Sequence, residues 1–317
     1  MKHGIWTKCI VVSAFFIIFL VWFIFEWKLN NIYRESYTNQ SNHLTDEWTM
    51  ESQIPNIIWT FWDDSEIPPF IVRCIQSWKE YNPNYKIIVL NKTNLGNYIP
   101  EIDFTKIRAA NDFIQRYSDY ARIHVLSKYG GFWFDASIIC QASNRWIHDI
   151  QNETGAEYIG YYIDQATIPE YVNMSPVVEN WCFACIPGSV FIQDWLNEFM
   201  VLNNYENAKQ YVDAVLESGV NPQKIDQPEY LTMHLSAQKI LQNNPNKYKL
   251  HLLRAEDTAF RHLVDDHGNW DGDDNGARRI IEKTHSDQPL LKLIGLIRNQ
   301  VIDQCNEKNI DIETLFI

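Results

Sequence analysis

The amino-acid sequence predicts an α/β domain whose sheet is largely parallel in its first half, preceded by a transmembrane helix. Two observations lead to this fold class. Short apolar segments alternate with segments of helical spacing from Ile54 to Gln242, a pattern typical of strands connected by helices. An uninterrupted apolar run also lies close to the N-terminus. The chain has 317 residues, 46% of them hydrophobic, and is therefore long enough to bury a full core.

The apolar run extends from Cys9 to Phe25 and contains no charged residue. As a helix it would be roughly 25 Å long, enough for a thin bilayer. We expect an uncleaved signal anchor, because the run ends in bulky residues; a cleaved signal peptide, which would end in small residues, is the alternative. Residues 1–8 would then form a short tail, residues 26–53 a polar stem, and residues 54–317 the globular domain.

A short tail before the anchor and a large domain after it favour a type II membrane protein with a lumenal domain, as in the Golgi or endoplasmic reticulum. Four Asn-x-Ser/Thr sequons are consistent with that orientation; they begin at Asn39, Asn91, Asn152 and Asn173. Basic residues are equally numerous on both sides of the apolar run, so the positive-inside rule leaves a cytosolic domain as the alternative.

Within the globular domain, apolar runs bounded by Pro, Gly and Asn predict strands, and runs with apolar residues three and four positions apart predict helices. The expected strands are residues 54–62, 85–91, 130–140, 157–164 and 179–186. The expected helices are residues 68–82, about 106–129, 190–202, 208–217 and 229–242. In such sheets ligands bind beyond the carboxyl ends of the strands, where Trp62 and Asp135 are expected.

The charge and cysteine content exclude some classes of function. The formal net charge is −13 with only 27 Lys and Arg, which argues against nucleic acid as a partner, because phosphate contacts need a basic surface. Cys182 and Cys185 form a single C-x-x-C, and zinc needs four ligands, so two buried thiols are the favoured interpretation. A disulfide between them stays open for a lumenal domain.

One helix–turn–strand segment, Tyr117 to Ile139, brings together residues that can carry chemistry. Asp119 and Arg122 are three positions apart and share one helix face among apolar neighbours. They are either a surface ion pair or a partly buried pair that binds a ligand. Gly130 and Gly131 end the helix and allow a close backbone approach, and we include them among the substrate-binding residues; a plain helix terminator is the alternative.

Asp135 lies at the expected carboxyl end of the apolar strand, where an ionised carboxylate needs a partner. A divalent cation, Mg²⁺ or Mn²⁺, could bridge Asp135 and a diphosphate. Ser137 could add a hydroxyl ligand, because residues two apart on a strand point to the same side. The alternative is a carboxylate that pairs with Arg122 and holds no metal.

The stretch S-D-Y-A-R-I-H-V-L-S-K-Y-G-G-F-W-F-D-A-S resembles the signature of the capsular polysaccharide synthesis glycosyltransferases. These are relatives of the family 32 sugar transferases, which include yeast-type mannosyltransferases and, more distantly, clostridial toxin glucosyltransferases. Residues 54–91 are similar to the same family's first strand, helix and second strand, and Q-P-L-L-K-L at 288–293 is similar to its C-terminal strand or helix segment. The resemblance implies a GT-A-type nucleotide-diphospho-sugar transferase fold, a Rossmann-like mixed sheet flanked by helices.

The resemblance also implies roles for single residues. The first strand would contact the nucleobase, with Trp59 or Trp62 stacking on it; core packing is the alternative for both. Asp119 and Arg122 would hold the donor's sugar hydroxyls and phosphate, and Asp135 the ribose and the metal. Ser137 stands where broader relatives have a second, metal-chelating Asp, which weakens the expected Mn²⁺ binding. His285 is a further metal-ligand candidate, because relatives use a late His near the metal.

The Asp- and Gly-rich segment 265–276 is expected to be a solvated loop, or else a lid that closes on the donor. Taken together, these features predict a membrane-anchored hexosyltransferase. It would transfer a sugar from a nucleotide-diphosphate sugar to a glycan or polysaccharide acceptor, with retention of configuration by analogy. One alternative is a catalytically inactive relative that binds a partner. Another is a metal-dependent phosphodiesterase, for which the scattered His residues provide no cluster.

Overall fold

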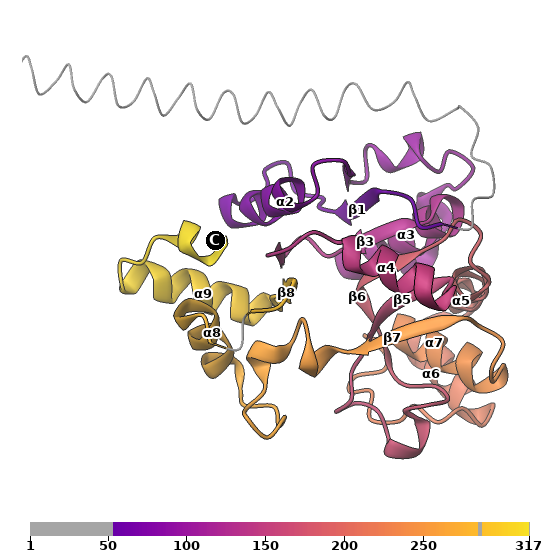
Figure 1. Cartoon of the computed structure of the whole chain (residues 1–317). Helices are drawn as coiled ribbons and strands as arrows, with labels where there is room; N and C mark the ends of the chain where they lie inside the picture. The colour runs from indigo at the N-terminus through magenta and orange to yellow at the C-terminus, as the bar shows by residue number, and fades with distance from the viewer. Residues whose placement is uncertain (1–52, 285–286, 317) are drawn as a thin grey trace, which may run out of the picture. The chain divides into compact units, whose positions relative to one another are not determined.

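The computed structural model describes residues 53–284 and 287–316, and its centre is a mixed sheet (Figure 1). In this part of the chain six strands pair in the order β2-β1-β3-β6-β5-β7. The strands are β1 Ile57–Phe61, β2 Lys86–Leu90, β3 Gly131–Phe134, β5 Tyr158–Tyr162, β6 Val178–Cys185 and β7 Leu250–Arg254. β2, β1 and β3 run parallel, whereas β6 is antiparallel to both β3 and β5. The prediction of a largely parallel first half is therefore confirmed.

Alternating side chains of β3 divide the core between the two faces of the sheet. Phe132 and Phe134 lie in the cluster formed with α2 (Pro69–Tyr81), whose Trp78 meets Phe134 edge to face. α4 (Arg145–Thr154) contributes Ile147 to the same cluster. Because Pro residues are accommodated in a first helical turn, Pro69 can begin α2 without loss of a backbone hydrogen bond.

The opposite face carries α3 (Ile114–Tyr129), α5 (Val190–Val201) and α7 (Thr232–Asn243), with α6 (Ala208–Glu217) packed against α7. Trp195 of α5 donates a hydrogen bond from Nε1 to the carbonyl of Met233 at the start of α7. The expected helix at 106–129 is shorter than predicted. Its first part consists of separate 3₁₀ turns at Phe104–Lys106 and Arg108–Asn111.

The strand expected at residues 130–140 is two strands. A turn at residues 135–138, closed by a hydrogen bond from the amide of Ile138 to the carbonyl of Asp135, separates β3 from β4 (Ile138–Cys140). β4 leaves the main sheet and pairs antiparallel with β8 (Leu290–Lys292). Beside β8 lie α8 (Asp273–Glu282) and α9 (Gly295–Glu307), as Figure 1 shows in gold and yellow. The sequence patterns missed α4, β7, α8 and α9, and the resemblance left the segment that contains β8 open as a strand or a helix. The remaining 3₁₀ turns are Leu95–Asn97, Pro169–Tyr171, Leu202–Asn204, Ala255–Asp257, Arg261–Leu263 and Ile312–Phe316.

The predicted single-pass membrane arrangement has to be corrected. Over residues 53–284 and 287–316 no helix is both long and apolar enough to cross a bilayer. The longest of them, α3, has 16 residues and is therefore roughly 24 Å long, against a hydrocarbon core of about 30 Å. The structure thus does not support the predicted anchor and localisation. The expected span at 9–25 and nearly all of the expected stem lie outside the described residues.

Cys182 and Cys185 are free, buried thiols on β6, as the favoured interpretation predicted. They pair with different residues of β3, Phe134 and Gly131. Burial raises the pKa of both thiols, so they act as small apolar side chains of the core.

Candidate functional site

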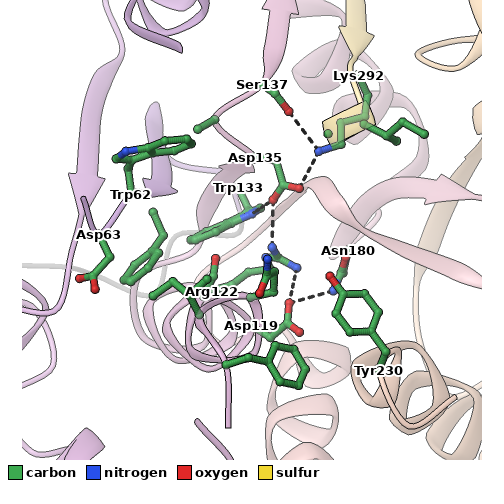
Figure 2. Close-up of a pocket in the computed structure, with 18 of the residues that line it drawn as sticks. Trp62, Asp63, Asp119, Arg122, Trp133, Asp135, Ser137, Asn180, Tyr230 and Lys292 are labelled. Atoms are coloured by element: carbon green, nitrogen blue, oxygen red, sulfur yellow. Dashed lines mark hydrogen bonds and ion pairs between the residues drawn. The ribbon is translucent and has the colours of Figure 1, made fainter. Parts of the chain in front are cut away.

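A cavity of about 810 Å³ opens beyond the carboxyl ends of β1 and β3 (Figure 2). Because these strands are parallel neighbours, Trp62 and Asp135, which follow them, reach the same edge of the sheet. Residues of α3, α7 and α9 complete the wall. The volume is within the range of about 300–1,000 Å³ typical of small-molecule sites.

The floor of the cavity is a continuous chain of polar contacts, visible across the middle of Figure 2. Asn180 donates from Nδ2 to Oδ1 of Asp119 at 3.1 Å, and Arg122 donates from Nη1 to the same oxygen at 2.8 Å. Arg122 also donates from Nη2 to Oδ1 of Asp135 at 2.9 Å. Lys292 continues the chain with its Nζ 2.7 Å from Oδ2 of Asp135. The sequence thus predicted correctly that Asp119, Arg122 and Asp135 converge.

Local structure fixes the two acidic residues. Asp119 and Arg122 are one turn apart on α3, and Asp135 directly follows β3, with its amide bonded to the carbonyl of Trp181 on β6. Trp133 contacts both Asp135 and Arg122. Its Nε1 donates to Oδ1 of Asp135 at 3.0 Å, and the centre of its ring lies 4.8 Å from the guanidinium of Arg122. Each charged group is therefore held by more than one contact.

Lys292 was not predicted. β8 pairs with β4 in a register that places Lys292 opposite Ile138, and this brings its ammonium to the turn that carries Asp135. The signal in the sequence was a single Lys within the apolar segment L-L-K-L, because a charged residue in a buried strand requires a partner. Asn180, at the beginning of β6, was missed as well.

The electrostatic environment shifts the pKa values of Asp135 and Asp119 in opposite directions. Burial alone would raise the pKa of Asp135, but the charges of Lys292 and Arg122, with hydrogen bonds from Lys292 and Trp133, lower it. Burial raises the pKa of Asp119, although the charge of Arg122 opposes the shift. Asp135 is consequently the more firmly ionised member of the pair.

The residues at the predicted metal position do not fit a divalent cation. Ser137 lies in the turn rather than on a strand, so its expected alignment with Asp135 on one strand face is wrong. Its Oγ donates to the carbonyl of Leu293 at 2.7 Å. The ammonium of Lys292 lies against both expected ligands, Asp135 and Ser137. Among the described residues, no group of three or more His, Cys, Asp or Glu is placed to hold a metal ion. His285 lies outside those residues.

The two tryptophans of the first strand have different environments. Trp59 is fully buried, stacks on Tyr129 and donates from Nε1 to the carbonyl of Gly130 at 3.0 Å. Trp59 is therefore packed in the core, which was the alternative to stacking on the nucleobase. Trp62 is partly buried and lines the cavity, so it remains the candidate for stacking on a base.

The Gly pair has a structural task. Gly130 ends α3 with a φ of +62°, and a Cβ there would lie 2.6 Å from the backbone nitrogen of Pro187. Gly131 has a φ of +94°, and a Cβ there would lie 2.7 Å from the carbonyl oxygen of Ile57 on β1. Neither is among the residues that line the cavity, so the structure supports their role in the backbone geometry, and their contact with a substrate stays a prediction.

Residues 265–272 of the segment 265–276 form a largely exposed loop, as the loop interpretation predicted, and internal contacts hold its shape. Oδ1 of Asp265 accepts hydrogen bonds from the amides of His267 and Asn269, and Trp270 packs edge to face on Phe260. α8 begins within the segment, at Asp273. None of its described residues is among those that line the cavity, so the structure gives a lid role here no support.

An aromatic rim borders the cavity and was not predicted from the sequence. The rings of Phe113 and Tyr230 stack at 5.4 Å with an interplanar angle of 15°, and both line the cavity. Tyr230 is 47% exposed, and Ile114 beside Phe113 is also exposed. The site thus combines a charged floor with an apolar, solvent-accessible edge.

The chain is similar to a family of capsular polysaccharide synthesis proteins and to a glycosyltransferase. The sequence profile of the family described as capsular polysaccharide synthesis protein matches residues 24–288, most of the chain. A curated relative, O-glycosyltransferase braB of Annulohypoxylon truncatum, is 27% identical over 167 residues, which cover 46% of this chain and 37% of that relative. The chain therefore spans little more than a third of the length of the relative it matches.

Similar solved structures include the PaToxG glycosyltransferase, with 13% identity and a TM-score of 0.34 over 69% of this chain and 95% of that chain. The UDP-bound glycosyltransferase domain of the YGT toxin has 10% identity and a TM-score of 0.33, covering 59% of this chain and 68% of that one. For the ligand-free YGT domain the identity is 9% and the TM-score 0.39, over 83% and 92% of the two chains.

Proposed function

This chain belongs to the capsular polysaccharide synthesis protein family, and from that premise we propose that it transfers a sugar from a nucleotide-diphosphate sugar to a glycan or polysaccharide acceptor. The observation that carries the proposal is the Asp119–Arg122–Asp135 cluster on the floor of the cavity. Carboxylates next to a fixed guanidinium suit a ligand that presents sugar hydroxyls and phosphate oxygens together.

In this proposal the donor lies across the cavity from Trp62 to Asp119. Trp62 stacks on the nucleobase, since an indole face accepts any base. Asp119, which is only partly buried, accepts hydrogen bonds from the sugar hydroxyls. Arg122 and Lys292 supply positive charge to the diphosphate between these two ends.

The transfer breaks the bond between the anomeric carbon and the diphosphate oxygen, and the electron pair leaves with the nucleoside diphosphate. An acceptor hydroxyl oxygen forms the new bond to the anomeric carbon and loses its proton, which the departing diphosphate can take up. The cationic side chains stabilise the negative charge that develops on the leaving group. The aromatic rim of Phe113 and Tyr230 offers flat apolar faces on which an acceptor sugar can pack. By analogy with related sugar transferases we propose retention of configuration, which NMR of the product's anomeric proton would test.

A thermal-shift screen of nucleotide sugars tests this proposal. UDP-, GDP- and dTDP-linked sugars are each added to the full chain, with a CMP-linked sugar as the monophosphate comparison. A diphosphate donor at a hundred times its Kd stabilises the folded state by about 2.7 kcal/mol, enough to raise the Tm by several degrees. Asp135→Ala should abolish the shift, whereas Asp213→Ala, an exposed carboxylate paired with Lys209, should keep it. A shift of equal size in both variants would contradict the proposed site.

A further inference from the structure

We propose that the ammonium group of Lys292 stands in for the divalent cation at this site, so that the chain binds its nucleotide-diphosphate ligand without a metal. The inference rests on the proposed function and concerns how the same cavity holds the diphosphate.

The position of Lys292 is the first argument. Its Nζ lies 2.7 Å from Oδ2 of Asp135 and 3.4 Å from Oγ of Ser137, the two oxygens at which the sequence predicts a metal. A divalent ion such as Mg²⁺ binds oxygen at about 2.0–2.1 Å and would have to displace the ammonium to reach Asp135. The other oxygen of Asp135 is occupied too, by the contacts from Arg122 and Trp133.

The rigidity of Lys292 is the second argument. Its side chain is only 9% exposed, and its backbone is fixed on both edges, by pairing with Ile138 on β4 and by a hydrogen bond from its amide to the carbonyl of Ala259. A displaced ammonium would leave a charge buried without a partner, which is strongly unfavourable. Lys292 is therefore a built part of the site rather than a mobile surface chain.

The third argument is chemical. An ammonium has three N–H groups, and Asp135 and Ser137 engage two of them, so the third can donate to a phosphate oxygen in the cavity that Lys292 lines. α9 begins at Gly295, directly after this strand, and its positive N-terminal end adds to the same region. Arg298, on the first turn of α9, also lines the cavity. These groups can neutralise a diphosphate as a bound cation would.

Calorimetry on the wild-type chain gives the first test, with UDP, GDP and dTDP as the probes. Each is titrated in EDTA and again in excess Mn²⁺. The inference predicts that the nucleotide which binds does so with Kd values within about threefold in the two buffers. Binding that requires Mn²⁺ would overturn the inference and leave the proposed function intact. If none of the three nucleotides binds in either buffer, the proposed function and the inference both fail.

Two variants test Lys292 directly. Lys292→Met keeps most of the side-chain volume and removes the charge, and it should weaken binding in EDTA at least tenfold. Lys292→Ala combined with Ser137→Asp removes the ammonium and creates an Asp-x-Asp pair, so its nucleotide binding should depend on Mn²⁺. Lys239→Ala is the matched control, because Lys239 forms a partly buried pair with Glu198 and does not line the cavity.

The cooperative thermal transition of each variant is recorded before titration. A folded Lys292→Met variant that binds as tightly as the wild type in EDTA overturns the inference. Should that variant not fold, the wild-type titrations in EDTA and Mn²⁺ decide the question by themselves.

Discussion

Lys292 and Asp135 form an ion pair of 2.7 Å across 157 positions of the sequence. The pair joins β8, near the C-terminal end, to the end of β3, and it links Lys292 to Arg122 through a single carboxylate. The candidate site therefore depends on two segments that the chain brings together only when it is folded. The predictions below test which contacts hold this site and which would act on a ligand.

Asp119 is expected to contribute to both stability and binding. Removing its carboxylate with Asp119→Ala leaves Arg122, whose side chain is 5% exposed, with one charged partner fewer. We expect a loss of about 2 kcal/mol in the free energy of unfolding, because the buried guanidinium of Arg122 loses one of its two carboxylate partners and keeps only Asp135. Asp119→Asn, whose amide oxygen can still accept from Arg122 and Asn180, should lose less than half as much. Urea unfolding measures both, and equal losses would show that the hydrogen bonds accepted by residue 119 contribute nothing beyond the charge of Asp119.

Trp62 and Trp59 should separate binding from folding. Trp62→Ala removes the proposed stacking face, worth about 1–3 kcal/mol for a base, and should weaken UDP or GDP binding roughly 5- to 150-fold. Trp59→Ala empties a fully buried site and should cost about 3–5 kcal/mol of folding stability. Calorimetry and thermal melts of both variants are compared. Unchanged affinity in Trp62→Ala would remove Trp62 from the binding site.

Gly131 should not tolerate a side chain. In Gly131→Ala the new Cβ would meet the carbonyl oxygen of Ile57 at 2.7 Å, and the φ of +94° is unfavourable for alanine. We expect a loss of more than about 2 kcal/mol of stability. Gly96→Ala is the control, because nothing lies within 4 Å of its Cβ, and it should be neutral or slightly stabilising. If denaturant midpoints fall equally in both, the close approach of β1 and β3 is not what requires Gly131.

Acid should destabilise the fold through buried histidines. Burial, with the charge of Arg279 nearby, lowers the pKa of His262 to about 3. The unfolded chain takes up this proton below about pH 6.5 and the folded chain does not, so stability is lost as the pH falls. Between pH 6.5 and 5 this histidine alone accounts for about 1.5–2 kcal/mol.

His262→Leu should therefore flatten the pH dependence of the unfolding free energy in that interval. Burial also lowers the pKa of His124, to about 4, so part of the slope should persist in the variant. The exposed His267→Gln is the matched control. A wild-type slope that survives His262→Leu unchanged would exclude His262 as the cause.

The central motif could be predicted from the sequence because its determinants are local. The spacing of Asp119 and Arg122 fixes their common helix face, and the Gly pair and the apolar run after it fix the turn and the strand. Because the connection between α3 and β3 is short, Asp135 then lies close to Asp119 and Arg122. The parallel pairing of β1 with its neighbours followed from the alternation of strands and helices in the same way.

The contact between Lys292 and Asp135 could not be predicted in this way. It depends on the register of β4 with β8, and no periodicity in the sequence encodes a pairing over so long a separation. The turn after Asp135 could not be predicted, because apolar residues lie on both sides of it. The sequence pattern of β3 and β4 is therefore that of a single strand. For this reason the sequence suggested a metal ligand at Ser137, whereas the folded chain places an ammonium group there.

Donor turnover tests the central claim most directly. The full chain is incubated with UDP-, GDP- and dTDP-linked sugars, and released nucleoside diphosphate is measured for the wild type, Asp135→Ala and the control Asp213→Ala. The account predicts that at least one donor is turned over, that Asp213→Ala keeps the wild-type rate, and that folded Asp135→Ala loses at least about 100-fold, or roughly 2.7 kcal/mol of transition-state stabilisation. Turnover of none of these donors, with or without Mn²⁺, or a wild-type rate in Asp135→Ala, would contradict it.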